Sequence, residues 1–323
     1  MSGKVGSASF SVFLVDGSDL LPAKVKSVSH KITALNEATL GLGDSAEGKT
    51  PTGVSKIDLT QSGAFFDDAT NGAHALLTPT SATAVSRIVT FAYNGNTLGN
   101  PFVGISGAYG MSYEVIGQSA KLTKANVSYE VSGTLDRGVI LQIQGALTTT
   151  GNGTSVDYTL DPSQRNIPIT SATKANPCVV TTTVPHGLTT GQKVLIAANT
   201  LAGPSINSDL AVTVVSTTTF SVAVNTTGSS GAGTGGSFVL SSSVNGGAGV
   251  QAISAYSGFT GVIGKIQHAP DDSTWADLLT FANVTTGPGA QRVTAAGTVD
   301  RYTRYVRTVS GAGSITPFVG FAR

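Results

Sequence analysis

Charge and cysteine are both scarce in this sequence of 323 residues. Charged residues make up only 11%, and 19 basic residues nearly balance 18 acidic ones, which leaves a formal net charge of +1. Such a chain has no bulk field that attracts nucleic acid or an anionic membrane. The single cysteine, Cys178, excludes an internal disulfide and a multi-cysteine zinc site. Because soluble monomers usually carry more surface charge, we expect other subunits to bury much of this surface.

Long apolar runs are missing as well. The N-terminal MSGKVGSASFSVFLV has one Lys and a short apolar run interrupted by Ser, which is too short for a secretory signal. No window approaches the roughly 20 apolar residues that a membrane helix needs. We therefore expect a protein made in a cytoplasm, with no membrane partner. The Asn-x-Ser/Thr sequences at Asn126, Asn152, Asn225 and Asn283 are then ordinary turn chemistry.

Glycine is what the sequence has in abundance, with 40 residues, beside frequent Ser, Thr, Ala and Val. This composition is typical of strands joined by tight turns, whereas disorder would bring high net charge and few β-branched residues. Alternation through Val127, Tyr129 and Val131 predicts a half-buried strand. Asp16-Gly17 and Asn94-Gly95 predict turns. The fold class that we predict is mainly β.

Two segments depart from this pattern. LGLGDSAEGKTPTGVSKIDLTQSG, over residues 40–63, predicts a long exposed loop with Glu47 and Lys49 near its tip. GAFFDDATNGAHALLTP, over residues 63–79, predicts one helix, with Asp67 and Asp68 in its first turn. Its apolar residues at helical spacing are Phe65, Phe66, Ala69, Ala73, Leu76 and Leu77.

The composition changes near residue 166. Between Asn166 and Leu240 the only charged residues are Lys174, Lys193 and Asp209. Short apolar segments (CVVTTT, KVLIAA, LAVTVVS and FSVAV) alternate with turn signals and end at the Gly- and Ser-rich NTTGSSGAGTGGS. We predict a main domain in two parts, 1–165 and 241–323, with a small all-β module inserted over 166–240.

Cys178 and His186 are the first candidates for chemistry. If CVVTTT and KVLIAA pair as a hairpin, His186 lies in the connecting loop and Cys178 at the far end, roughly 20 Å away at about 3.3 Å per residue. A thiolate nucleophile needs its base within hydrogen-bond reach. Asp209 is the only acidic residue of the module that could orient the imidazole. We interpret Cys178 as a buried apolar residue and His186 as a turn residue.

Two further motifs have ordinary structural interpretations. GAGTGG, over 231–236, matches the dinucleotide fingerprint. That fingerprint needs a following helix and then an acidic residue that binds the ribose, but a strand-like SFVLSSSV follows here and the next acidic residue along the chain is Asp271. We interpret it as a flexible exit linker. In DDSTW, the adjacent Asp271 and Asp272 would point to opposite faces of a strand, and the alternating oxygen donors of a calcium loop are missing. We predict a hairpin turn whose Trp275 anchors the returning strand.

RYTRYVR interleaves Arg and Tyr, a spacing that also suits stacking with single-stranded nucleic acid. On a strand, Arg301, Tyr305 and Arg307 share one face, and cross-strand or intersubunit pairing with Asp and Glu is the commoner use. G-x-S-x-G, H-E-x-x-H and P-loop motifs do not occur. We therefore expect no catalytic residue, no cofactor, no metal site and no enzymatic activity.

Two segments resemble bacteriophage major tail (tail tube) proteins. The first is LGDSAEGKTPTGVSKIDLTQSGAFFDDATNGAHALL, and the second is the end of the chain, with DDSTWADL, RYTRYVR and GFAR. The resemblance covers residues 1 to about 165 and 241–323. The middle, from ITSATKANPCVV to FSVAV, is similar to a small β module that recurs in phage virion proteins and has been likened to a β half-domain of ubiquitin-activating enzymes. No catalytic cysteine carries over from that comparison.

The resemblance implies a tail-tube β-sandwich or barrel with one flanking helix. Six copies would form a ring, and stacked rings would form the tail tube through which DNA is ejected without sequence-specific binding. Tape-measure, tail terminator and baseplate proteins would be its partners in the virion, after assembly in the host bacterial cytoplasm. The family's lumen tends to be acidic, and the sequence leaves open which of Asp58, Glu114, Glu130 and Asp136 would line it.

The loop over 43–53 matches the family's extended loop, which reaches a neighbouring subunit or the next ring. This implies an inter-ring or subunit contact through Asp44, Glu47, Lys49, Pro51 and Thr52. Since a tube lumen is narrow, we expect the 166–240 module to project outward as decoration.

Two other classes stay open. A glycan-binding tail protein or adhesin would use the 166–240 module as its binding unit, although Phe220 and Phe238 are the only aromatic residues there. A capsid decoration or tail terminator protein would form a single ring or trimer without polymerising.

Overall fold

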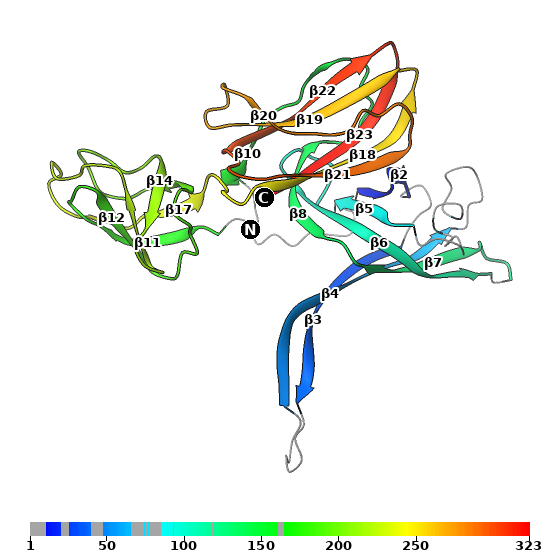
Figure 1. Ribbon diagram of the computed structural model, residues 1–323, viewed down its shortest axis with the longest axis horizontal. Coiled ribbons are helices and arrows are strands. Elements are labelled where there is room, and N and C mark those ends of the chain that lie inside the picture. Colours follow the sequence, from blue (N-terminus) through cyan, green and yellow to red (C-terminus); the bar gives the residue numbers. More distant parts are fainter. Residues whose placement is uncertain are drawn as a thin grey trace.

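The computed structural model describes residues 11–20, 26–39, 48–65, 74, 77, 85–92, 94–117, 119–160 and 165–323. Strands are the main regular element of these ranges, which confirms the mainly β fold class (Figure 1). The one helical element with assigned bounds in this part of the chain is a 3-10 turn, η2 (Tyr158–Leu160). Within the described residues there is no helix long and apolar enough to cross a membrane.

The largest sheet has 11 strands. Its central path runs through β2 (Ser18–Asp19), β1 (Val12–Val15), β5 (Arg87–Ala92), β6 (Pro101–Ile116), β8 (Leu135–Gln142), β23 (Ser314–Ala322), β18 (Gly247–Ser257) and β21 (Gly289–Ala295). The first turn forms where the sequence predicts it, because Asp16 (φ 47°) and Gly17 (φ 85°) take the positive φ values that a two-residue hairpin turn requires. β1 is buried on both faces, as its unbroken apolar sequence VFLV requires.

A second sheet, of 5 strands, packs against part of the first. It contains β10 (Val156–Asp157), β22 (Tyr302–Ser310), β19 (Gly261–Ala269), β20 (Ala276–Thr280) and β9 (Gly151–Asn152). A core of buried side chains joins it to β8 and β23, with Tyr305 and Ile266 on one side and Leu141 and Phe321 on the other. This sandwich places the N-terminal and C-terminal parts of the chain in one unit.

The remaining strands of the large sheet form a wing. β3 (Ser27–Thr39) pairs with β4 (Gly48–Phe65), β4 pairs with β7 (Lys124–Val131), and β7 pairs with the second half of β6. The predicted alternation in β7 is confirmed, because Val127, Tyr129 and Val131 face the same core as Leu59 of β4. Beyond Ile57, which pairs with both Ile32 and Val131, β3 and β4 pair only with each other among the described strands. They leave the sheet there as a two-stranded arm (Figure 1).

The predicted helix over 63–79 falls mostly outside the described residues. Its first residues were placed wrongly, because Ala64 and Phe65 still belong to β4 and pair with Ala125 and Lys124. Of the rest, His74 and Leu77 are described. Leu77 is buried in the core behind the wing, and His74 Nδ1 lies 2.7 Å from the hydroxyl of Tyr113. The flanking helix itself stays a prediction.

Residues 167–240 form a sheet of their own. β11 (Ile167–Ala172), β12 (Cys178–Thr182), β15 (Thr219–Val222), β14 (Asp209–Val214), β13 (Lys193–Ala197) and β17 (Ser237–Leu240) pair in that order, and β17 pairs back with β11. The six strands therefore close into a small barrel, with β16 (Gly233–Thr234) beside β11. Phe220 and Phe238 meet edge to face in its core, with ring centroids 5.2 Å apart. Because β11 and β17 are adjacent, the chain enters and leaves the barrel at neighbouring points.

Candidate assembly surfaces

One face of the β3–β4–β7–β6 wing carries mainly polar side chains. Residues in register across a sheet point to the same face, and the face opposite to the core therefore shows rows of partners. One row contains Lys31, Asp58, Glu130 and Tyr109, the next contains Ser29, Thr60, Ser128 and Ser112, and a third, interrupted by a bulge in β4, contains Ser27, Ser62, Asn126 and Glu114. We call this surface the polar face.

Hydrogen bonds and ion pairs cross the polar face from strand to strand. The hydroxyls of Ser112 and Ser128 are 2.6 Å apart. Lys56 Nζ lies 3.2 Å from Asp58 and 3.9 Å from Glu130. The hydrogen bond with Asp58 raises the pKa of Lys56, and the charges of both carboxylates act in the same direction. All these groups are close to solvent, so the pairs fix side-chain positions more than they stabilise the fold.

Three of the four acidic residues considered for a lumen lie on the polar face. Asp58, Glu114 and Glu130 lie on it, and Lys31, Lys56 and Lys124 lie on the same face, so three carboxylates stand against three ammonium groups and the charges balance. Asp136 does not belong to this surface. It is buried at 8% exposure and forms a two-pronged ion pair with Arg292, at 2.6 and 2.9 Å.

The wing ends in two strands whose outer edges have no partner among the described residues. β3 pairs with β4 alone, and the part of β6 from Tyr109 to Ile116 pairs with β7 alone. Edge strands of this kind present N–H and C=O groups that can pair with another strand. A protein that is stable in solution usually covers them, and another chain is one way to do so.

The arm is the second feature that reaches away from the body of the molecule. It consists of residues 33–39 paired with 48–56, and residues 40–47 connect its ends. The expected exposed loop is therefore wrong from Gly48 onward. Lys49 and Pro51 of β4 pair with Ala38 and Asn36 of β3, so the backbone finds its partners within the chain.

Of the five predicted contact residues, three lie on this strand. Lys49, Pro51 and Thr52 belong to β4, near the outer end of the arm. Asp44 and Glu47 fall outside the described residues. The sequence signal that could have revealed the β3–β4 hairpin, of which the arm is the outer part, is the polar alternation of Ser27, Ser29 and Lys31, matched by Asp58, Thr60 and Ser62.

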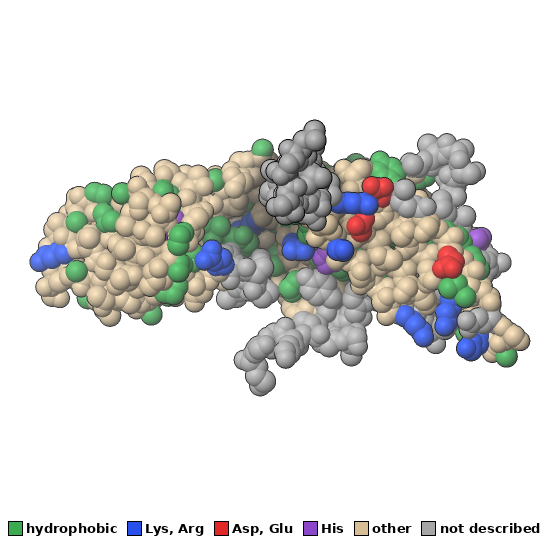
Figure 2. All heavy atoms as spheres, turned by 90° about the horizontal axis from the view of Figure 1, so that it is seen from below, with side chains coloured by type: hydrophobic (Ala, Val, Ile, Leu, Met, Phe, Trp, Pro, Cys, Tyr) green, Lys and Arg blue, Asp and Glu red, His purple; other side chains and the backbone are tan. Residues whose placement is uncertain are grey.

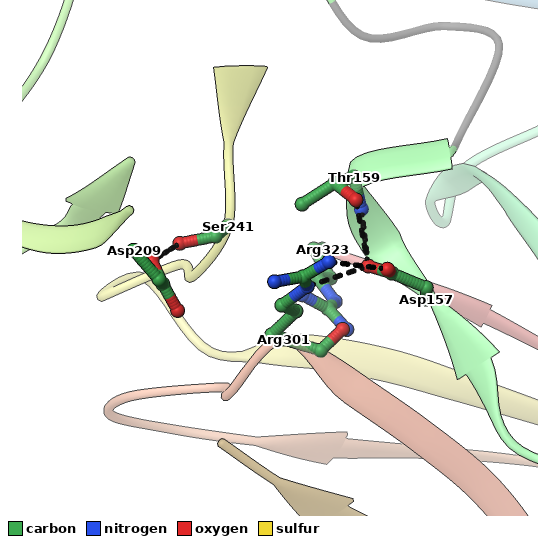
Figure 3. Close-up of polar contacts among 6 residues, drawn as sticks. All are labelled: Asp157, Thr159, Asp209, Ser241, Arg301 and Arg323. Atoms are coloured by element: carbon green, nitrogen blue, oxygen red, sulfur yellow. Dashed lines mark hydrogen bonds and ion pairs between the residues drawn. The ribbon is translucent and has the colours of Figure 1, made fainter. Parts of the chain in front are cut away.

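A cluster of polar contacts lies within the sandwich, close to Asp209 and Ser241 at the exit of the chain from the barrel (Figure 3). Arg301 donates to both carboxylate oxygens of Asp157, at 3.0 and 2.7 Å, and Asp157 also accepts from the backbone and hydroxyl of Thr159. Burial acts to raise the pKa of Asp157, but the hydrogen bonds from Arg301 and Thr159 outweigh it and the pKa is lowered. Arg323 stacks on Tyr158 of η2, 3.8 Å from its ring centroid.

On the barrel side of this junction, Ser241 donates its hydroxyl hydrogen to Asp209 of β14 (Figure 3). Ser242 accepts from the backbone of Lys193 of β13, at 2.9 Å. The chain leaving the barrel is thus bonded to two of its strands before it enters the sandwich. These contacts anchor the barrel at its root.

RYTRYVR lies at the start of β22, and its side chains contact other residues of the same chain. Tyr305 is fully buried and donates to Gln251 at 3.0 Å. Arg304 stacks on Trp275, at 4.1 Å, and Arg307 donates to the carbonyl of Thr149, at 2.7 Å. Together with the Arg301–Asp157 pair, these contacts give the motif an intramolecular role.

DDSTW forms the predicted turn between β19 and β20. Asp271 accepts from the backbone N–H groups of Ser273 and Thr274, at 3.0 and 2.7 Å, and these bonds lower its pKa to about 2. The contact of Trp275 with Arg304 on β22 shows how the indole ring fixes the returning strand.

Cys178 and His186 do not meet. Cys178 is fully buried and its thiol donates to the carbonyl of Thr173. His186 Nδ1 accepts from the backbone of Leu188, and its ring packs edge-on against Phe220. The assumed hairpin of CVVTTT and KVLIAA is wrong, because β12 pairs with β11 and β15, and β13 pairs with β14 and β17.

GAGTGG also differs from its interpretation as a flexible linker. Gly233 and Thr234 form β16 against β11, and the carbonyl of Gly236 accepts from Ile169. The strand predicted to follow is β17. Among the described residues there is no cluster of three or more His, Cys, Asp or Glu side chains that could hold a metal ion.

Comparisons with known proteins give no family for this chain. No family model and no curated protein matches it. Among solved structures, the SPP1 Dit (gp 19.1) protein, described as a paradigm of the hub adsorption apparatus in phages that infect Gram-positive bacteria, is similar at a TM-score of 0.27 and 9% identity. The match covers 97% of this chain and 100% of that chain. A likeness at this level carries no argument about the fold or role of this chain.

Proposed function

We propose that the protein is a structural subunit of a phage tail tube, which assembles into hexameric rings that stack around a lumen for DNA. The observation that carries this proposal is the wing. Its sheet has one polar face and a free edge at each side, β3 and the second half of β6, among the described strands.

The two edges and the polar face of the wing suit a ring of subunits. If the β3 edge of one copy pairs with the β6 edge of the next, the free backbone groups are satisfied and the sheets join into a closed barrel. Identical head-to-tail contacts of this kind close into a ring when the rotation fits. The polar face would then line the lumen, and because its acidic and basic side chains balance, it would carry no net positive charge to hold DNA.

In this arrangement the arm would reach a neighbouring subunit or the next ring, and Lys49, Pro51 and Thr52 lie on it. The barrel over 167–240 would sit outside the tube as decoration, and the flanking helix would lie beside the sandwich. Tape-measure, terminator and baseplate proteins would be partners in the virion, and the protein would have no catalytic role.

The glycan-binding alternative has less support. Phe220 and Phe238, the aromatic residues of the barrel, are both buried, at 0% and 2% exposure. They cannot form the exposed platform on which sugars stack.

Negative-stain electron microscopy of the purified protein, at increasing concentration, tests the proposal. Hollow tubes or six-fold rings with regular outer knobs are the expected result. Particles that stay monomeric or trimeric at every concentration would contradict it and favour a decoration protein.

A further inference from the structure

The 167–240 barrel has a cavity of about 220 Å³ at the end where the chain enters and leaves it. Ile167 at the start of β11 and Phe238 of β17 are register partners at this end, and both line the cavity. Leu188, between β12 and β13, and Leu240, at the end of β17, add further apolar walls. A hollow with apolar walls and a few polar groups is typical of a site for a small molecule.

One polar side chain of this cavity is buried and only partly hydrogen-bonded. Gln192 is 6% exposed, and its Oε1 accepts from the backbone N–H of Thr189, at 2.8 Å. The backbone N–H of Gln192 donates in turn to the carbonyl of Thr189, at 3.2 Å, so a closed turn holds the side chain in place. Its Nε2 has no hydrogen-bond partner among the described residues. Because buried polar groups are almost always hydrogen-bonded, this amide is a donor for an acceptor that enters the cavity.

A cation stands at the rim of the same cavity. Arg165, just before β11, is exposed and forms no ion pair with a described acidic residue. The described carboxylates nearest to it in sequence, Asp157 and Asp209, accept hydrogen bonds from other residues. Figure 2, in which the barrel lies at the left, shows few charged side chains on this face of it. The donors of Arg165 and Gln192, and not a sum of charges, define the site, because Asp161 lies outside the described residues.

His186 also lines the cavity, but its ring nitrogens are bonded within the barrel. Nδ1 accepts from the backbone N–H of Leu188, at 3.0 Å, so the hydrogen of the neutral ring is on Nε2. Nε2 donates to the carbonyl of Thr219, at 3.4 Å. The side chains of Gln192 and Arg165 are thus the donors that we assign to a ligand.

We infer that this cavity binds a small carboxylic acid with a short apolar chain. The carboxylate accepts from Nε2 of Gln192 and from the guanidinium of Arg165, whose planar set of donors matches a carboxylate. The apolar chain lies against Ile167, Leu188 and Phe238. At roughly 30 Å³ for each water-sized group, the cavity holds about seven such groups, which limits the ligand to a short chain. The site belongs to the barrel and does not depend on the proposed tube.

Saturation-transfer NMR on the full chain, with hexanoate, hexan-1-ol and hexylamine as matched probes, tests this site. The three molecules share one apolar chain and differ in the charge of the head group. We expect hexanoate to bind with a Kd of about 1 mM, hexan-1-ol at least tenfold more weakly, and hexylamine not at all. Equal signals from all three probes, or none from hexanoate, would overturn the inference and leave the amide of Gln192 to water.

Two variants assign the binding to this cavity. Gln192→Glu keeps an oxygen for the N–H of Thr189 and replaces the NH₂ group by a second oxygen. We expect it to weaken hexanoate at least tenfold and to make hexylamine the better ligand. Arg165→Gln should weaken hexanoate about fivefold, because its ion pair is close to solvent. Lys174→Gln, an exposed position at the opposite end of the barrel, is the control and should change nothing. Unchanged binding in both Gln192→Glu and Arg165→Gln would place the ligand elsewhere.

A carboxylate can belong to a free acid or to the end of a peptide chain, and one further comparison separates these sources. Acetyl-Ala-Leu carries a free carboxylate beside an apolar side chain, and its C-terminal amide is the matched control. Tighter binding of this dipeptide than of hexanoate would assign the site to the chain end of a partner protein, and weaker binding would assign it to a free acid. Equal binding of the dipeptide and its amide would contradict a carboxylate site.

The result is distinguishable from that of the proposed function. Binding is measured on the ligand signal, so it can be detected whether the protein forms tubes or stays monomeric. A protein that forms tubes and binds no hexanoate would remove the site and keep the tube, and the reverse outcome would keep the site alone.

Discussion

At the scale of single residues, Gly320 is where β23 passes closest to an aromatic ring. A Cβ atom at this position would lie 2.5 Å from ring carbons of Phe102, which is itself only 1% exposed. Gly320→Ala should therefore lower the free energy of unfolding by about 1–3 kcal/mol, because the ring has no room to move in a packed core. Urea denaturation would measure the change. Gly289→Ala in β21, where an added Cβ meets nothing within 4 Å, is the control and should stay close to the wild type.

Asp157 gives the molecule a pH-dependent contribution to stability. Its pKa in the folded protein is lowered from 3.8 by the hydrogen bonds with Arg301 and Thr159. The stabilisation is therefore complete above the unfolded pKa and is lost as the pH falls through the lower folded pKa. Asp157→Asn should cost roughly 1 kcal/mol at neutral pH, given the partial exposure of the pair.

The measurement is thermal unfolding of the wild type and Asp157→Asn between pH 7 and pH 2. We expect the difference in Tm to be constant down to about pH 4 and to shrink below it. A difference that grows on acidification would show that Asp157 acts through something other than its charge. Asp271→Asn, in an exposed turn, provides a comparison with no buried partner.

At the scale of elements, the sequence predicts strands well where the alternation is local. Val127, Tyr129 and Val131 alternate in β7 as expected, and the short apolar runs from Cys178 to Val222 became strands at almost the same residues. The pairing of those strands could not be predicted, because closure of the barrel depends on the pairing of β11 with β17, which are far apart in the chain.

The arm also shows that local composition does not predict strands that form through pairing with a distant segment. Its residues are rich in Gly, Pro, Ser and Thr, which locally favour a loop. In the structure the pairing of β3 with β4 outweighs this preference, because the backbone groups of the two strands find partners across the hairpin. The candidate surface was likewise hidden, since a polar face and free edges are properties of neighbouring strands and not of any motif.

Shortening the arm tests its role in assembly. Removal of residues 36–51, with Leu35 joined to Thr52 through two glycines, leaves the pairs of β4 with β7 intact, because those start at Ile57. We expect the variant to keep its far-UV spectrum and Tm and to form single rings or monomers, but no tubes, in electron micrographs. Replacement of residues 40–47 by Gly and Ser of the same length is the matched control for arm length. Tubes of normal length in the shortened variant would contradict a stacking role.

At the scale of the whole molecule, the barrel over 167–240 is attached at one point. Ile167 and Phe238 are register partners in adjacent strands, so the two ends of the insertion lie side by side. The hydrogen bond of Ser241 with Asp209 ties the chain that leaves the barrel to β14, and neither residue belongs to a strand of the wing. A unit attached in this way can be removed without stretching the chain that remains.

Deletion of residues 166–240 with a short Gly/Ser bridge should therefore leave assembly intact. The core of the sandwich, with Tyr305, Phe321 and Leu141, loses no member, and the free edges of β3 and β6 are unchanged. We expect tubes of the same inner appearance without outer knobs, because the barrel contributes neither to the polar face nor to the arm. Circular dichroism and Tm of the deleted protein provide the folding control. A variant that is folded but forms no tubes would mean that the barrel lies between subunits, and the outward position would then be wrong.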